Sequence, residues 1–234
     1  MKIYVNGCSF TFGDELADPK KSSWPMLLGN HDIVNDAMSG GTNQRIVYKT
    51  IKNSCNNYDL YLIAWTTYTR YTFYKSDNNY ETNFNPQLRH TLYSGEQFFK
   101  DWGKTLYMHW YNELYAFKLW LQQIIQLQNF LRGKNYLMIN AFHNHLNDWS
   151  AKWPDFISAV ENLVNFSVMN DEQLLDEYRE IQYYINLIDT TKFYKWGEFY
   201  LSGLPETFER GPNGHFLEEG HIYVSNLIKN QLHI

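Results

Sequence analysis

The stretch VNGCSFTFGDEL (residues 5–16) leads from a short apolar strand straight into a turn, and it indicates both the fold and the place of a site. The strand covers residues 2–7, is rich in β-forming residues and ends at Gly7. The turn then presents Cys8 and Ser9, two side chains that can act as nucleophiles. Both residues are also small enough to fill a tight turn, so the rest of the chain has to decide between these interpretations.

Short apolar strands alternate with helical patterns along the rest of the chain. Further strands are predicted at residues 31–36, 59–65, 135–142 and 185–189, and helices at 22–30, 43–55, 96–132, 153–168, 171–184 and 216–232. This alternation is typical of a parallel sheet whose two faces are covered by helices. The predicted fold class is therefore α/β, with a central parallel sheet and helical insertions.

The size of the chain suits one domain. It has 234 residues, 44% of them hydrophobic, which is enough for one well-covered core. We expect a single domain over residues 1–234, with insertions at about 66–95 and 146–184. The 19 Tyr, 15 Phe and 8 Trp either pack the core or line a groove for a flat, sugar-like ligand. The apolar helix predicted at 96–132 either packs in the core or pairs with a second copy of the chain.

Charge and residue usage weigh against several classes of function. A net charge of −5 disfavours a broad phosphate-binding surface, so no nucleic-acid partner is expected. Cys8 and Cys55 do not make a disulfide framework and fit a reducing compartment or indifference to redox state. No apolar run reaches the roughly 18 residues of a membrane span, and residues 2–6 are predicted as a strand and not as a leader. We therefore expect a cytoplasmic protein with no membrane partner.

Candidate site residues follow the predicted strands at their carboxyl ends, where parallel sheets bind ligands. Ser9 follows the first strand, where its backbone N–H can also serve as an oxyanion donor. Gly40 follows the second strand, and glycine there lets the backbone approach a ligand. Thr66 and Thr67 follow the third and offer hydroxyl donors. His215 lies in a glycine-rich loop before the last helix and can supply the base that a nucleophilic serine needs.

The order and spacing of these residues resemble the blocks of the SGNH/GDSL hydrolase family. The matching stretches are GCSF (7–10), SSWP (22–25), NDAMSGGTN (35–43) and NGHFLEEG (213–220). The third of these places the glycine of the family's second block on Gly40. The resemblance covers the sheet and both ends of the chain, and it has no specific motif within 66–132 or 146–205.

The resemblance implies a flavodoxin-like, three-layer α/β/α fold and the hydrolysis of esters, with no cofactor and no metal. By the resemblance Ser9 is the nucleophile and His215 the general base, and the Ser9 and Gly40 amides are oxyanion donors. Cys8 is then a packing residue, because adjacent residues near a strand end tend to point to opposite faces. The alternative, a Cys8 nucleophile, requires its side chain on the open side of the turn.

Cys8 stands where the family has Asp, and the chain departs from the family at two further positions. Thr66 stands where the family has an Asn amide as a third oxyanion donor, and Asn43 is a substitute candidate. Losing one such donor typically costs roughly 10²–10³ in rate. Asn213 stands where the family has the Asp that orients the histidine. We therefore predict a catalytic dyad of Ser9 and His215, with Asn213 assisting the imidazole.

Three more residues at the same edge, Trp65, Thr67 and His143, are predicted to contact the substrate. His143 and His145 are also spaced to ligate a metal together, although no cluster of Cys or carboxylates adjoins them in sequence. Two functional hypotheses stay open. One is a serine esterase for a small-molecule or glycan ester, such as an acylated carbohydrate. The other is a carbohydrate-binding protein of the same fold with weakened catalysis.

Overall fold

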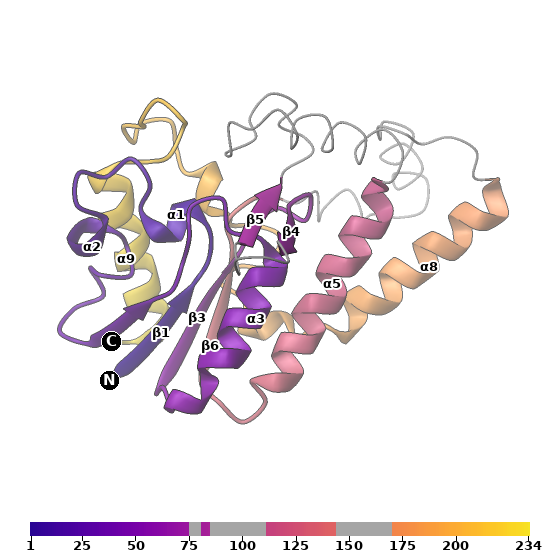
Figure 1. The fold of residues 1–234 in the computed structure, drawn as a ribbon, viewed down its shortest axis with the longest axis horizontal. Helices are drawn as coiled ribbons and strands as arrows, with labels where there is room; N and C mark the ends of the chain where they lie inside the picture. Colours follow the sequence, from indigo (N-terminus) through magenta and orange to yellow (C-terminus); the bar gives the residue numbers. More distant parts are fainter. Residues whose placement is uncertain (75–80, 85–110, 144–169) are drawn as a thin grey trace. The chain divides into compact units, whose positions relative to one another are not determined.

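The computed structural model of the protein describes residues 1–74, 81–84, 111–143 and 170–234 (Figure 1). By proximity the chain groups into two compact units, the first made of residues 1–67, 129–144 and 190–234, the second of 68–128 and 145–189. The single domain predicted for residues 1–234 stays a prediction. The first unit contains every predicted site residue.

A four-stranded parallel sheet forms the centre of the first unit. Its strands are β1 (Lys2–Asn6), β2 (Asp32–Asn35), β3 (Leu60–Trp65) and β6 (Tyr136–Asn140). They lie in the order β2-β1-β3-β6, and all three pairings are parallel. Counted along this sheet alone, the order is 2-1-3-4, as in flavodoxin-like folds. The predicted α/β fold with a central parallel sheet is therefore confirmed.

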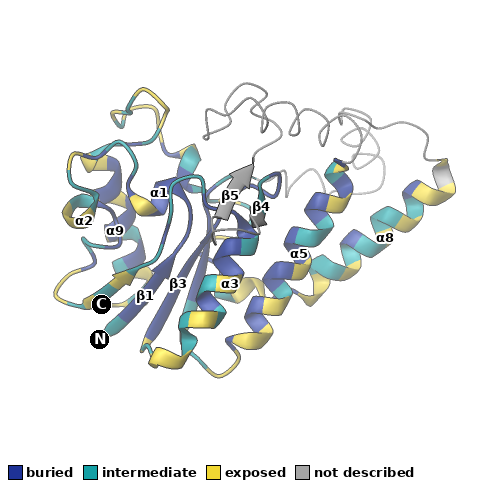
Figure 2. Cartoon of the chain, in the orientation of Figure 1, coloured by how far each residue is buried: buried dark blue, intermediate teal, exposed yellow. Residues whose placement is uncertain are grey.

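Helices cover both faces of this sheet, so the first unit has three layers (Figure 1). Helix α9 (Glu218–Leu232) packs on one face, where Val224 and Ile228 join an apolar cluster with alternate residues of β1, β3 and β6. Helix α3 (Asn43–Asn53) covers the other face, where Asn6 Nδ2 donates to Ile46 O at 3.1 Å. Alternate side chains of a strand point to opposite faces, and helices cover both faces of this sheet. As a result, β3 is buried along its whole length (Figure 2).

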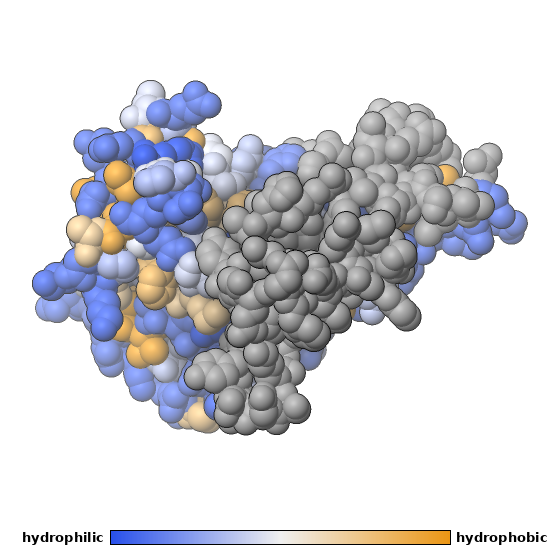
Figure 3. Space-filling view, turned by 45° about the horizontal axis from the view of Figure 1, so that its top comes forward, coloured by the Kyte–Doolittle hydropathy of each residue, from blue (hydrophilic) through white to orange (hydrophobic). Residues whose placement is uncertain are grey.

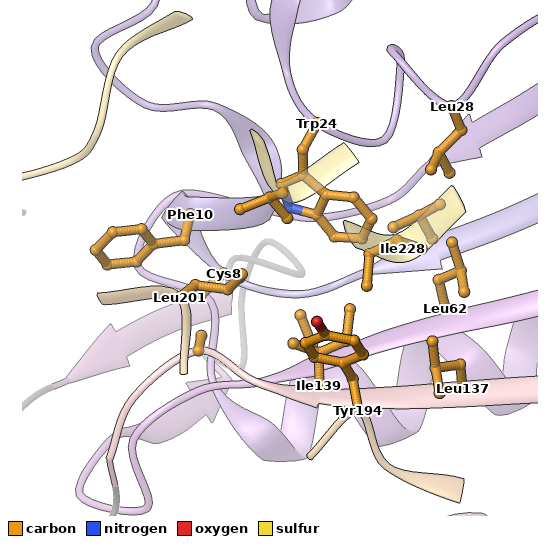
Figure 4. Close-up of a cluster of buried hydrophobic side chains, with 14 of the residues drawn as sticks. Cys8, Phe10, Trp24, Leu28, Leu62, Leu137, Ile139, Tyr194, Leu201 and Ile228 are labelled. Atoms are coloured by element: carbon orange, nitrogen blue, oxygen red, sulfur yellow. The ribbon is translucent and has the colours of Figure 1, made fainter. Parts of the chain in front are cut away.

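The apolar cluster beneath α9 includes the turn after β1 (Figure 4). Cys8 has no exposed surface and belongs to this cluster together with Phe10 and Trp24. The prediction that Cys8 packs into the core is therefore confirmed. Trp24, from the SSWP stretch, is also fully buried, and its backbone N–H donates to His221 Nδ1 at 3.0 Å.

Two predicted elements are wrong. The helix lies earlier, at α2 (Pro19–Ser22), and residues 24–27 form turns, because Pro19 suits the first helical position and Ser23 is extended. The strand predicted at 185–189 overlaps the end of a helix. Its place beside β6 is taken by single parallel bridges from Phe193 to Met138 and from Tyr200 to Asn140.

The remaining short helical elements of the first unit are α1 (Ser9–Phe12), η1 (Ser54–Asn56), η2 (Thr190–Lys192) and η3 (Leu201–Gly203). They lie in the connections between the longer elements. Among them, α1 follows β1 directly and carries Ser9 as its first residue.

The described part of the second unit contains an antiparallel pair and two helices. The pair is β4 (Tyr71–Tyr74) with β5 (Glu81–Phe84), and the helices are α5 (Glu113–Phe130) and α8 (Asp171–Leu187). Lys118 joins α5 to α8 through Glu177 and Glu180, at 2.7 and 2.6 Å. The predicted helix at 153–168 and the first part of the one at 96–132 lie outside the described residues.

On the face drawn in Figure 3, the coloured residues are mostly hydrophilic, with scattered hydrophobic side chains. None of the helices within the described ranges combines the length and the hydropathy needed to cross a bilayer.

Candidate active site

Glycine shapes the turn after β1. A Cβ on Gly7 would lie 2.5 Å from Thr11 Oγ1 and 3.0 Å from the Ala64 Cβ, so a larger residue does not fit there. This close packing lets a helical turn start at Ser9, immediately beyond the sheet. Ser9 is 3% exposed, and among the described residues its backbone N–H has no acceptor.

A second turn, residues 38–41, lies against the first. The Met38 N–H donates to Gly7 O at 3.2 Å, and a Cβ on Gly41 would lie 3.0 Å from the same oxygen. Gly40 occupies the third position of the turn with a φ of 66°, in the left-handed region that favours glycine. A Cβ on Gly40 would meet nothing within 4 Å, and within the described part of the chain its N–H has no acceptor.

The loop that carries His215 packs beside the Ser9 turn. It is a tight hairpin in which the backbones of Arg210 and Phe216 form an antiparallel bridge. The His215 ring centroid lies 4.8 Å from that of Phe10, the residue after Ser9. Folding therefore brings the two ends of the chain to the same place. No hydrogen bond joins Ser9 to His215 among the residues described.

Glu15 is the carboxylate partner of His215, and the sequence analysis missed it. Glu15 Oε2 lies 2.9 Å from His215 Nδ1 and accepts the His215 backbone N–H at 3.1 Å. Glu15 Oε1 accepts the backbone N–H and the side-chain amide of Asn213, at 2.8 and 3.2 Å. A carboxylate that the predicted dyad of Ser9 and His215 did not include therefore lies at the imidazole. Asn213 contacts the acid and not the imidazole.

The surroundings of Glu15 favour its charged form. Burial alone would raise the pKa of Glu15, but the backbone N–H of Asn213 and the bonds from His215 outweigh it and hold the pKa below its usual value. An ionised carboxylate accepts a hydrogen bond from Nδ1–H, so we assign the His215 tautomer that carries its hydrogen on Nδ1 and leaves the Nε2 lone pair available. In the described residues, His215 Nε2 has no hydrogen-bond partner.

The backbone around Glu15 is specialised as well. Its φ is 71°, a conformation that a non-glycine residue adopts only when its surroundings hold it there. A Cβ on Gly211 would lie 2.6 Å from the Glu15 Cδ, so Gly211 makes room for the carboxylate. The local signal for Glu15 was the acidic pair that follows Gly13 in the opening stretch, six residues after the candidate nucleophile.

At the end of β3, the two residues predicted as oxyanion donors, Thr66 and Asn43, bind each other. Asn43 Oδ1 accepts the Thr66 N–H at 2.9 Å, and Asn43 Nδ2 lies 3.2 and 3.3 Å from Thr66 O and Thr67 O. The Asn43 side chain therefore holds the strand end in place. Thr66 has no exposed surface and cannot reach a substrate in this conformation, whereas Thr67 is 8% exposed.

Trp65 is the next residue that the sequence predicts as a substrate contact. It is fully buried, because Leu62 and Ala64 point to the α9 face and the strand alternation turns Trp65 to the opposite, equally covered face. His143 is partly exposed after β6, and its ring centroid lies 5.2 Å from that of Tyr200. The metal alternative involves His145, which lies outside the described residues. Within the described ranges, no three His, Cys, Asp or Glu side chains are grouped for a metal.

No model of a known protein family matches the chain, and no curated protein matches it in sequence. Three solved structures have a similar chain course. The psychrotrophic esterase EstA of Pseudoalteromonas sp. is 8% identical over 99% of this chain and 96% of that one, with a TM-score of 0.47. A protein assigned to the lipolytic G-D-S-L family, from Desulfitobacterium hafniense, is 12% identical over 98% and 99%, with a TM-score of 0.42. The extracellular lipase of Streptomyces rimosus is 12% identical over 98% and 99%, with a TM-score of 0.40. At such low identity none of them assigns a role to a residue of this chain.

Proposed function

We propose that the protein is a serine ester hydrolase of the SGNH/GDSL type, with Ser9 as nucleophile, His215 as general base and Glu15 as the acid that orients it. One observation carries the proposal: a carboxylate bound to Nδ1 of a histidine whose ring packs on the residue next to Ser9. A serine hydroxyl, an imidazole and a carboxylate brought together in this way are the components of a triad.

In the proposed mechanism, His215 Nε2 takes the Ser9 Oγ proton as that oxygen attacks the ester carbonyl. The backbone N–H groups of Ser9 and Gly40 stabilise the negative charge of the tetrahedral intermediate, since both lack an acceptor in the described residues. His215 then gives the proton to the leaving alcohol. Water, activated by the same nitrogen, releases the acyl group. Glu15 stays ionised and stabilises the imidazolium that forms in each step.

The Ser9–His215 hydrogen bond is expected to form with substrate in place. Catalytic hydrogen bonds are often long or poorly aligned in the unliganded protein and tighten only in the reacting complex. The contact that must already exist is the one that fixes the base, and Glu15 provides it at 2.9 Å.

We take an ester of a carbohydrate as the substrate class. Partly exposed aromatic side chains at the same edge of the sheet support this choice, because flat rings suit the apolar faces of sugars. His143 and Tyr200 are such a pair, with their ring centroids 5.2 Å apart. This choice predicts that acetylated sugars are hydrolysed faster than simple alkyl acetates. Equal rates for the two kinds of ester would rule out the carbohydrate as the preferred substrate class.

Hydrolysis of a small activated acetyl ester tests the reaction itself. Ser9→Ala should abolish turnover, because no other hydroxyl replaces the nucleophile. Cys8→Ala is the matched control, since Cys8 is fully buried in the core and should leave activity within a few-fold of wild type. Turnover that survives Ser9→Ala but is lost in Cys8→Ala would assign the nucleophile to the cysteine.

A second candidate function is a carbohydrate-binding protein with weakened catalysis. It is favoured by the end of β3, where Thr66 is buried and the Asn43 amide is already engaged, so that no third oxyanion donor is supplied there. This candidate predicts saturable glycan binding without turnover. It also predicts that Ser9→Ala leaves that binding unchanged.

A further inference from the structure

Asp14, the neighbour of Glu15, connects the nucleophile turn to the Gly40 turn. Its backbone N–H donates to Ser9 O at 3.1 Å. Its side-chain Oδ2 accepts the hydroxyl of Ser39, the residue directly before Gly40. One residue therefore bonds both to Ser9 and to the turn that carries the second candidate oxyanion donor.

Two further bonds tie the first part of this loop to the Ser9 turn. Asn35 Nδ2 donates to Thr11 O at 3.1 Å, and the Met38 N–H donates to Gly7 O at 3.2 Å. A Cβ on Gly40 would meet nothing within 4 Å, so the space on that side of the residue is open. The hydroxyl that binds Asp14 belongs to Ser39, the residue that shares a peptide group with Gly40.

We propose that Asp14 is a positioning residue, which through Ser39 fixes the direction of the Gly40 N–H toward the oxyanion. This role rests on the proposed function. The adjacent carboxylates then divide the work: Glu15 orients the base, and Asp14 orients a donor. Neither Asp14 nor Ser39 touches the reacting atoms.

The physical reason is preorganisation. An oxyanion donor lowers the barrier only when it already points at the place where charge develops. Glycine has the fewest steric limits on its backbone dihedral angles of any residue type. An N–H on Gly40 therefore needs a restraint from outside the residue to keep its direction. A hydrogen bond to a charged carboxylate is shorter and about twice as strong as a neutral one, which suits this purpose.

Kinetics of an activated acetyl ester test the role directly. Asp14→Ala and Ser39→Ala should each lower kcat by about 10- to 100-fold, the range expected for a misdirected donor, while KM changes less than about threefold. The double variant should be no slower than the slower single one, because both changes remove the same bond. The conservative variants Asp14→Asn and Ser39→Thr, which keep an acceptor and a hydroxyl, should recover most of the rate.

Asp18→Asn is the matched control. Asp18 lies four residues further on, is partly exposed, and its carboxylate pairs with Lys21 at the surface, so its loss should leave kcat unchanged. Additive losses in the Asp14→Ala/Ser39→Ala double variant would overturn the proposal, and so would a change in KM with kcat unchanged.

Backbone hydrogen exchange gives a readout that does not depend on turnover. In Asp14→Ala and Ser39→Ala, the segment 37–41 should exchange at least about tenfold faster, while the segment around His215 stays protected. Unchanged exchange in 37–41 would refute the positioning role even in an active enzyme. If wild type has no Ser9-dependent turnover while exchange responds as expected, the proposed function fails and the bond between the two turns stands.

Discussion

The carboxyl ends of β1 and β3 are neighbours in the sheet, yet they are built in opposite ways. After β1 the chain turns at once into a helical turn, and the Ser9 N–H has no acceptor in the described ranges. After β3 the Thr66 N–H donates to Asn43 Oδ1, and the side chains of Trp65 and Thr66 are fully buried. One strand end leaves a donor available, and the other has its donor occupied.

The difference comes from partners that are distant in sequence. Asn43, at the start of α3, closes the end of β3. The end of β1 is met by Glu15 and the His215 loop, which bind each other and leave the Ser9 N–H without an acceptor in the described residues. The edge of a parallel sheet therefore locates a site, while the loops that meet each strand decide which residues there can act.

The largest effect is expected from Glu15→Gln, which disrupts the contact between Glu15 and His215 at the end of β1. The amide offers an N–H where Nδ1 needs an acceptor, so it favours the tautomer with the proton on Nε2, which cannot serve as base. In triads the corresponding change costs about 10⁴ in rate, and we expect the turnover rate to fall by a factor of about 10³–10⁴. Ester hydrolysis by the purified variant measures it. Glu206→Gln, at an exposed position, is the control, and equal activity of the two variants would contradict the assigned role of Glu15.

Gly211→Ala should act on the same pair with a smaller effect. Gly211 does not have a positive φ, so alanine is allowed there, but its Cβ would lie 2.6 Å from Glu15 Cδ and displace the carboxylate. A displacement of about 1 Å in a catalytic group typically costs on the order of 10²-fold in rate. Combining Gly211→Ala with Glu15→Gln should give no further loss, whereas Glu209→Ala, nearby and exposed, should keep the wild-type rate.

Asn43→Ala tests the end of β3. This variant should lose stability and keep most of its turnover rate. It leaves the buried Thr66 N–H without its acceptor, which costs about 1–3 kcal/mol of the free energy of unfolding. The rate at low temperature should stay within a few-fold of wild type. Denaturant titration and ester hydrolysis measure the two quantities. A loss of roughly 100-fold in rate with unchanged stability would instead restore Asn43 as an oxyanion donor.

The sheet could be predicted from sequence because its signals are local. The run LYLIAW in β3 is apolar throughout, as a strand covered on both faces must be, and the spacing of Ile46, Val47 and Thr50 in α3 marks its buried side. Strand ends then placed Ser9 and Gly40 at one edge by topology alone. These inferences need no knowledge of which loop packs where.

The acid could not be predicted in this way. The bond between Glu15 and His215 joins residues 200 positions apart, and it depends on a left-handed backbone at Glu15 and on the missing side chain at Gly211. Neither is visible as a periodic pattern. The burial of Trp65 was missed for a related reason, because its residue type suggested a ligand contact while strand alternation turns the ring toward a covered face.

The most gradual expected effect is on the pH dependence of stability, which separates the contributions of His221 and Glu15 near the end of β1. Burial, with a further contribution from the charge of His215, lowers the pKa of His221 from 6.5 to about 3. The unfolded chain therefore binds a proton between these values that the folded chain does not. Stability should fall as pH decreases from 6.5, with a slope approaching about 1.4 kcal/mol per pH unit for this one group.

Glu15 acts in a lower window, because its pKa is lowered from 4.5: its stabilisation is present above that value and is lost as pH falls below it. His221→Asn, whose Oδ1 can still accept the Trp24 N–H, should flatten the slope between about pH 6 and pH 5 and leave the fall below 4.5. Glu15→Gln should keep the slope between about pH 6 and pH 5 and reduce the fall in stability below 4.5. His233→Asn, at the exposed C-terminus, is the control for loss of a histidine. Denaturant midpoints across this pH range decide the matter, and identical slopes in wild type and His221→Asn would show that His221 is not held neutral by the fold.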